Sequence, residues 1–236
     1  MTLSLNGYLN GLSALGVLII DLVIGIYIVY RAFKLNAKLL KYAGVMIIMI
    51  GLLWSGPALD FTKILLTGTN IPEDIKFIYV YASYIWVAPA IFIALNIGAE
   101  LIAPNKKKYI LGFILVVGIV FEIGLLIFPY DSYIYPDPYP TGENIIDTSL
   151  NFAFFTFYAL AIIIFTIIIF NGLGAFLKAR ESTGIVKKKF IYLGFAFLIF
   201  PVAAIFDTLI PPGAFLSIVR MFIIVSAVFL YLGLKP

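Results

Sequence analysis

The sequence predicts an all-α membrane protein, a bundle of seven transmembrane helices with the amino end outside the cell and the carboxyl end in the cytoplasm. Of the 236 residues, 63% are hydrophobic and 12% are charged, and the mean hydropathy is +1.11. A water-soluble fold cannot hide that much apolar surface. The apolar residues form stretches of about 20, the length that a helix needs to cross a bilayer. Basic residues lie in alternate connections, which indicates the orientation.

Short polar segments divide the chain into seven apolar stretches. The first stretch has no basic leader and no small-residue cleavage site, so we expect a retained helix rather than a signal peptide. The one long connection, residues 130–148, is rich in proline and is predicted to be non-helical. The spans leave no room for a soluble domain, so we expect a single domain over residues 1–236. The expected spans are Tyr8–Tyr30, Leu39–Leu59, Phe77–Ile102, Tyr109–Pro129, Ser149–Phe176, Phe190–Leu209 and Ala214–Leu234.

The connections alternate in charge, and cytoplasmic loops retain Lys and Arg. Thirteen basic residues lie on one side and two on the other, which places the basic side in the cytoplasm of a plasma membrane. The cytoplasmic set is Arg31, Lys34, Lys38, Lys41, Lys106, Lys107, Lys108, Lys178, Arg180, Lys187, Lys188, Lys189 and Lys235. The outer side has Lys63 and Lys76 with the acids Glu73, Asp74, Asp131, Asp137, Glu143 and Asp147. An outer aromatic belt and loop packing are expected from Tyr79, Tyr81, Tyr84, Tyr130, Tyr133, Tyr135 and Tyr139.

The same distribution limits the partners. The basic residues are spread over separate loops, so the net charge of +4 does not indicate nucleic acid; anionic membrane lipid is the expected neighbour. The chain has no cysteine and no histidine. The usual zinc ligands, thiolate nucleophiles and haem-binding histidines are therefore missing, and we expect neither a cofactor, a metal nor an enzymatic activity.

Arg220 is the most informative charge within a predicted span, because it keeps its proton and needs a partner, water or headgroups. Asp207, Asp60 and Glu122 are expected in the same outer layer. Three interpretations stay open. Arg220 forms a salt bridge from helix seven to helix six, or it meets an anionic ligand group in an outward-facing pocket that the acids tune, or it reaches up to the headgroups.

Asp21 falls near the middle of the first span, and no basic residue lies at its depth. Ser226 is expected at a similar depth and Asn96 somewhat deeper. A structural hydrogen bond and a proton or ion site both stay open for this carboxyl.

Three prolines, Pro57, Pro89 and Pro201, are expected to interrupt helices two, three and six. Trp54 and Trp86 lie inward of the expected interface, which makes them candidate walls of a ligand pocket.

The whole chain resembles the seven-helix sensor region that precedes many prokaryotic histidine kinases. The resemblance rests on Trp54, on Trp86 followed by Pro89, and on the run KARESTGIVKKKFIYLG at 178–194, which leads into Pro201 and Asp207. A kinase relative continues beyond the last helix, whereas here nothing is expected after Pro236. The resemblance therefore implies a stand-alone sensor or receptor-like protein that binds a small ligand from outside and signals through a separate cytoplasmic protein.

Other seven-helix classes were compared with the same residues. A microbial rhodopsin needs a lysine within helix seven, and this stretch has none before Lys235. Rhomboid-like, presenilin-like and prenyl-transferase motifs are missing, which disfavours those enzymes. A small-solute or ion transporter using Asp21 or the Arg220 layer is the alternative, and a non-catalytic subunit of a membrane complex is the third interpretation.

Overall fold

The computed structural model describes residues 3–136, 138 and 140–236, most of them helical. Asp137 and Tyr139, assigned above to the outer acids and the tyrosine belt, lie outside the described residues. The helices are α1 (Leu5–Lys34), α2 (Lys38–Leu52), α3 (Ser55–Thr67), α4 (Phe77–Tyr84), α5 (Val87–Ile102), α6 (Lys107–Ile127), α7 (Pro129–Ser132), α8 (Phe155–Thr166), α9 (Gly174–Glu181), α10 (Gly184–Leu209) and α11 (Ala214–Leu234). Short 3-10 helices η1 (Glu73–Ile75) and η2 (Pro104–Lys106), the π-helical turn η3 (Ile167–Leu173) and the strands β1 (Tyr133–Ile134) and β2 (Ser149–Leu150) complete it.

Six helical segments are long and apolar enough to cross a membrane, and α2 with α3, bent by 44°, makes a seventh if the pair is one span. The protein thus fits a multi-pass membrane protein, and the predicted apolar stretches fall on these segments. The fifth was predicted to begin too early, because Ser149–Leu150 pairs with Tyr133–Ile134 as an antiparallel two-stranded sheet and α8 begins at Phe155.

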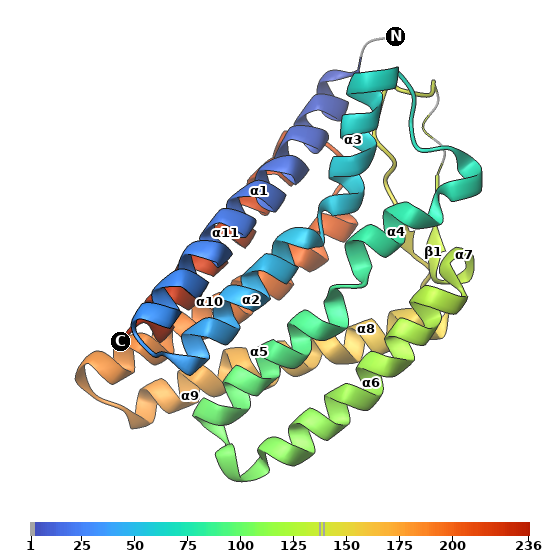
Figure 1. Ribbon diagram of the computed structural model, residues 1–236. Coiled ribbons are helices and arrows are strands. Elements are labelled where there is room, and N and C mark those ends of the chain that lie inside the picture. Colours follow the sequence, from blue (N-terminus) through green and yellow to red (C-terminus); the bar gives the residue numbers. More distant parts are fainter. Residues whose placement is uncertain (1–2, 137, 139) are drawn as a thin grey trace.

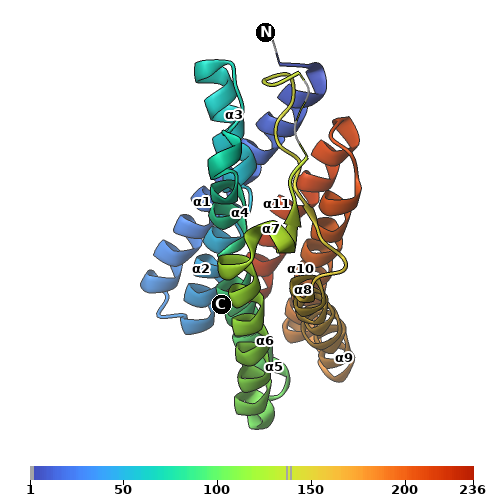
Figure 2. The ribbon, with the colours of Figure 1, turned by 90° about the vertical axis from the view of Figure 1, so that its right-hand side faces the viewer.

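The helices run side by side along one long axis (Figures 1 and 2). The amino terminus, the far end of α3 and the connection from α7 to α8 lie at one end, here called the loop end. The carboxyl terminus and the turns that follow α1, α5 and α9 lie at the other, called the basic end after its lysines and arginines (Figure 1).

The longest helix, α1, packs closely on α2 because small residues face each other. A Cβ built on Gly25 would lie 2.8 Å from the carbonyl oxygen of Gly44, and one built on Gly44 would lie 2.9 Å from that of Gly25. Close approach at small residues is the usual way in which membrane helices associate. The Ser4 hydroxyl begins α1 by accepting the Gly7 N–H at 3.0 Å.

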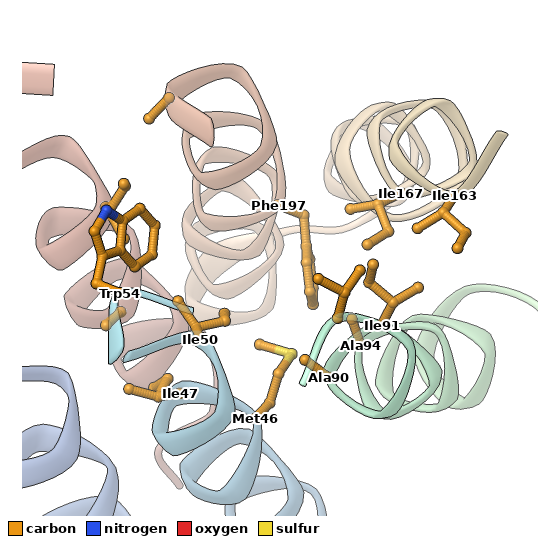
Figure 3. Packing of buried hydrophobic residues seen from close by; sticks show 14 of the residues in the cluster. Met46, Ile47, Ile50, Trp54, Ala90, Ile91, Ala94, Ile163, Ile167 and Phe197 are labelled. Carbon is orange, nitrogen blue, oxygen red and sulfur yellow. The ribbon is translucent and has the colours of Figure 1, made fainter. Parts of the chain in front are cut away.

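Apolar side chains of five helical segments meet at the centre of the bundle. Figure 3 shows Met46 and Ile50 of α2 facing Ala94 of α5, with Phe197 of α10 and Ile167 of η3 closing the group. They leave a cavity of only about 30 Å³, in which Ser226 supplies the hydroxyl. That hydroxyl already donates to the Ile223 carbonyl at 2.6 Å. The small central cavity therefore lacks the polar partners that hold a buried water.

Two of the three expected proline interruptions are present. The second span breaks at Leu53–Trp54, before Pro57, and the third at Ile85–Trp86, before Pro89. The prediction for Pro201 was wrong, since α10 continues through it.

Hydrogen bonds connect the segment after the first break with the segment before the second. Ser55 Oγ donates to the Ala82 carbonyl, and the Gly56 N–H donates to Ser83 Oγ at 2.9 Å. These bonds satisfy backbone groups that a broken helix would otherwise leave unpaired within the membrane.

Candidate functional site

Arg220 of α11 lies at the centre of a polar group near the loop end. Its Nε donates to Asp207 Oδ1 of α10 at 2.7 Å, and its Nη1 donates to the backbone oxygen and to Oδ1 of Asn10, both at 2.7 Å, and to Ser13 Oγ at 2.9 Å. Its side chain is 6% exposed and that of Asp207 is 19% exposed. The expected salt bridge from helix seven to helix six is confirmed, and α1 joins it as a third helix.

Asp147, in the connection that follows β1, belongs to the same group. Its side chain is exposed, yet enough protein surrounds its carboxyl that desolvation raises its pKa. Arg220 opposes that rise and Asp207 adds to it, so both charges act through space on the Asp147 carboxyl. The charges of Asp147, Asp207 and Arg220 also act on the Tyr84 hydroxyl of α4, which lies beside Thr148. We call Asn10, Ser13, Tyr84, Asp147, Asp207 and Arg220 the loop-end cluster.

The loop-end cluster keeps unused hydrogen-bonding capacity. Within the described residues, Arg220 Nη2, Asp207 Oδ2 and both Asp147 carboxyl oxygens make no hydrogen bond, and none of them is among the buried unpaired atoms. The cluster carries two carboxylates and one guanidinium. It therefore offers acceptors and negative charge, with one guanidinium edge as donor, to whatever reaches it.

Asp60 was expected in the same outer layer as Arg220, but its hydrogen-bond partners are in the long connection and not on Arg220. Its carboxylate accepts hydrogen bonds from the backbone N–H groups of Ile71 at 2.7 Å and Ile146 at 2.8 Å and from Asn70 Nδ2 at 2.8 Å. Asn70 in turn accepts from the Gly142 N–H at 2.7 Å. Asp60 thus anchors the long connection to α3 and makes no ion pair with Arg220.

Glu122, the other expected member, also lies apart from Arg220. It faces a groove between α5 and α6, and neither of its carboxyl oxygens has a hydrogen-bond partner in the part of the chain that is described.

The two tryptophans lie at the helix breaks. Trp54 precedes the first turn of α3 and is 4% exposed, within the apolar core. Trp86 precedes α5, and its Nε1 donates to the Ala82 carbonyl at 2.9 Å. Neither lines the central cavity or the groove of Glu122, and their role as walls of a ligand pocket stays a prediction.

Asp21 is completely buried in α1 against Gly51 of α2. Both of its oxygens lack a hydrogen-bond partner among the described residues. No hydrogen bond joins it to Asn96, which is half-buried, or to Ser226, which bonds within its own helix. The part of the chain that the structure describes therefore supplies no hydrogen bond to this carboxyl.

No family model, curated protein or solved structure matches this chain. The candidate sites consequently depend on the geometry described above. Among residues 3–136, 138 and 140–236, no three acidic side chains gather as metal ligands.

Sequence reasoning did not single out several residues that the structure brings together. Asn10 and Ser13 are three apart on α1, so they share a helix face, and their polarity within an apolar stretch was the available signal. Asn171 of η3 is another: its Nδ2 donates to the Ala94 carbonyl at 2.7 Å, while its Oδ1 is buried without a partner. Nothing in the sequence indicated the π-helical turn that carries it.

Proposed function

We propose that the chain crosses the plasma membrane seven times, with the loop end outside and the basic end in the cytoplasm. The bent pair α2 and α3 serves as one broken span in this arrangement. The support is the thirteen basic residues in and beside the helix ends at the basic end, against two on the other side.

In this orientation, we propose that the protein is a stand-alone membrane sensor that binds a small polar ligand at the loop-end cluster and signals through a separate cytoplasmic protein. The observation that carries the proposal is the position of Arg220. Its guanidinium ties α1, α10 and α11 together, and the Asp207 carboxylate that holds it also reaches solvent. A ligand that competes for Asp207 weakens this tie and changes how the three helices pack, including at the basic end.

The free groups of the cluster define the ligand chemistry. Asp147 and the free oxygen of Asp207 suit an ammonium group, and Arg220 Nη2 suits a carboxylate. A zwitterion, such as a free amino acid, matches both. The cluster's net negative charge favours this class over the simple anion considered from the sequence.

Transport of such a solute is less well supported, because the centre of the bundle offers no polar path. The cavity there is about 30 Å³, its walls are aliphatic and aromatic, and its one hydroxyl is already bonded. A zwitterion crossing it would lose its hydration without compensation.

The test uses the full chain in lipid nanodiscs and measures the midpoint of thermal unfolding with each of the twenty amino acids. A ligand present at 100 times its Kd stabilises a protein by about 2.7 kcal/mol, which is readily detected. Asp147→Asn should remove the ligand-dependent shift, and Asp131→Asn, an exposed change in the same connection, should retain it.

Two further measurements separate sensing from transport. A maleimide should label a cysteine at Thr183, at the basic end, at a rate that the stabilising ligand changes. Proteoliposomes should not accumulate that ligand. If no amino acid stabilises the protein, or if the ligand is accumulated, the sensor proposal is wrong.

Proton or cation transport is the second candidate, because Asp21 is fully buried at mid-span with two unpartnered oxygens. Such carboxyls in membrane spans commonly carry protons or ions. Proteoliposomes with a pH-sensitive dye should then show a flux that Asp21→Asn abolishes and that Asp131→Asn leaves intact. A wild-type flux equal to that of empty liposomes would exclude this candidate.

A further inference from the structure

An apolar groove on the side of the bundle shares no lining residue with the loop-end cluster. A groove of about 570 Å³ runs between α5 and α6 below the end of α4, and its walls are almost entirely apolar. That volume is within the range of about 300–1,000 Å³ typical of small-molecule sites. We call it the lateral groove; Ile85, Pro89, Phe92, Leu115, Gly118 and Glu122 are among its walls.

The groove opens toward lipid. Leu115, Ile119 and Ile123 of α6 line it and are 51%, 51% and 44% exposed. They belong to a segment with the length and hydropathy of a membrane span. An occupant therefore enters from the bilayer, and most of its surface must be apolar.

Among the residues that line the groove, Glu122 is the ionisable one. The residue is half-buried and lines the groove, and both of its carboxyl oxygens are buried without a hydrogen-bond partner among the described residues. The Ala88 backbone N–H is the polar group that acts on this carboxyl, and no cationic side chain of the described residues does; neither carboxyl oxygen reaches the geometry of a hydrogen bond. The carboxyl meets a cation in the groove when the side chain changes rotamer.

The break between α4 and α5 supports a negative charge at this place. Ala88 is in the first turn of α5, where its N–H donates to no backbone carbonyl of the described chain. The positive end of a helix dipole favours a carboxylate. Pro89 has no N–H and leaves the Ile85 carbonyl as another acceptor at the groove wall. A carboxylate and a carbonyl without a cation form a site that is complementary to positive charge.

We propose that the lateral groove binds a lipophilic cation from the bilayer, with the positive charge of the ligand against Glu122 and its apolar groups along α5 and α6. The ligand's charge supplies the partner that Glu122 lacks, and its apolar surface replaces lipid. This site is independent of the proposed sensor function, since it shares no residue with the loop-end cluster.

The test measures equilibrium binding of radiolabelled tetraphenylphosphonium to the full chain in phosphatidylcholine nanodiscs, with empty nanodiscs subtracted. Tetraphenylborate, of matched shape and opposite charge, is the control ligand. The cation should bind saturably at one site per chain and the anion should not. Glu122→Gln should weaken cation binding by at least about tenfold, because it removes a charge partner in an apolar site.

Two further variants serve as controls for the binding measurement. Glu100→Gln changes an exposed glutamate at the basic end that pairs with Lys107, and it should bind like the wild type. Leu115→Trp fills the groove without touching the carboxyl and should also weaken binding, which serves if Glu122→Gln fails to fold. Equal binding by wild type and both groove variants, or equal saturable binding of cation and anion, would overturn the proposal.

Discussion

Replacing Arg220 by methionine removes the charge at the centre of the loop-end cluster while keeping a side chain of similar length. The variant loses the ion pair with Asp207, formed at 2.7 Å, together with the hydrogen bonds to Asn10 and Ser13. It therefore loosens α11 from both α10 and α1.

The size of the effect follows from the burial of the partners. Removing one member of a buried ion pair typically costs about 3 to 5 kcal/mol. Asp207 is 19% exposed, so the carboxylate left by Arg220→Met is partly hydrated, and we expect a loss near 3 kcal/mol. Asp207→Leu leaves a guanidinium that is 6% exposed but still bonded to Asn10. Direct neighbours typically couple by about 0.5 to 3 kcal/mol, so the double variant should recover much of the combined loss.

The assay is reversible unfolding of the purified protein in mixed micelles by titration with sodium dodecyl sulfate, applied to both single variants and to the double variant. Arg180→Met is the matched control, because Arg180 is exposed at the basic end; it should change the free energy of unfolding by less than about 0.5 kcal/mol. Losses that add to within about 0.5 kcal/mol in the double variant would refute the coupling of Arg220 with Asp207.

Three other perturbations test the orientation and the long connection. Cysteines at Glu73 and Thr183, both exposed, should react with an impermeant maleimide from opposite sides of intact cells, and equal labelling would contradict the proposed orientation. Desolvation raises the pKa of Asp147 in the folded protein. The free energy of unfolding should therefore fall as the pH rises from the ordinary pKa near 3.9 through the raised pKa of the folded state. Asp147→Asn should remove that part of the pH dependence, and an unchanged pH dependence in the variant would show that Asp147 does not cause it. Asp60→Ala unpairs two backbone N–H groups, costing at least about 2 kcal/mol, and should expose residues 141–146 to protease, whereas an unchanged cleavage rate would show that Asp60 is no anchor.

Hydropathy alone located the long apolar helices, apart from the start of the fifth, because the requirement for about 20 apolar residues is strong and local. It also suggested the partner of Arg220, since a permanent charge in a span needs one and Asp207 ends the preceding helix. It did not place Asp60 correctly. Depth along a helix is readable from the sequence, but the direction of a side chain around the bundle depends on packing between distant segments, here between Asp60 and Ile146.

The breaks at Trp54 and Trp86 were only partly predictable. Proline indicates where a helix loses a hydrogen bond, yet Pro201 is accommodated within α10 while the other two follow breaks. The two breaks differ from the Pro201 region in the hydrogen bonds that neighbouring segments supply. Ser55 and Ser83 supply bonds across the two breaks, and such a reciprocal arrangement cannot be read from either segment by itself.

The carboxyls within the spans separate into two kinds by what surrounds them. Asp207 has a guanidinium and Asp60 has backbone N–H groups, so the fold itself explains why they are retained. Asp21 and Glu122 have neither, although an unpartnered acid in a membrane is costly. Packing alone would favour an apolar residue at both positions. In the two proposals above, a proton or ion at Asp21 and a cationic ligand at Glu122 offset this cost, and neutral variants at these two positions should then affect activity more than folding.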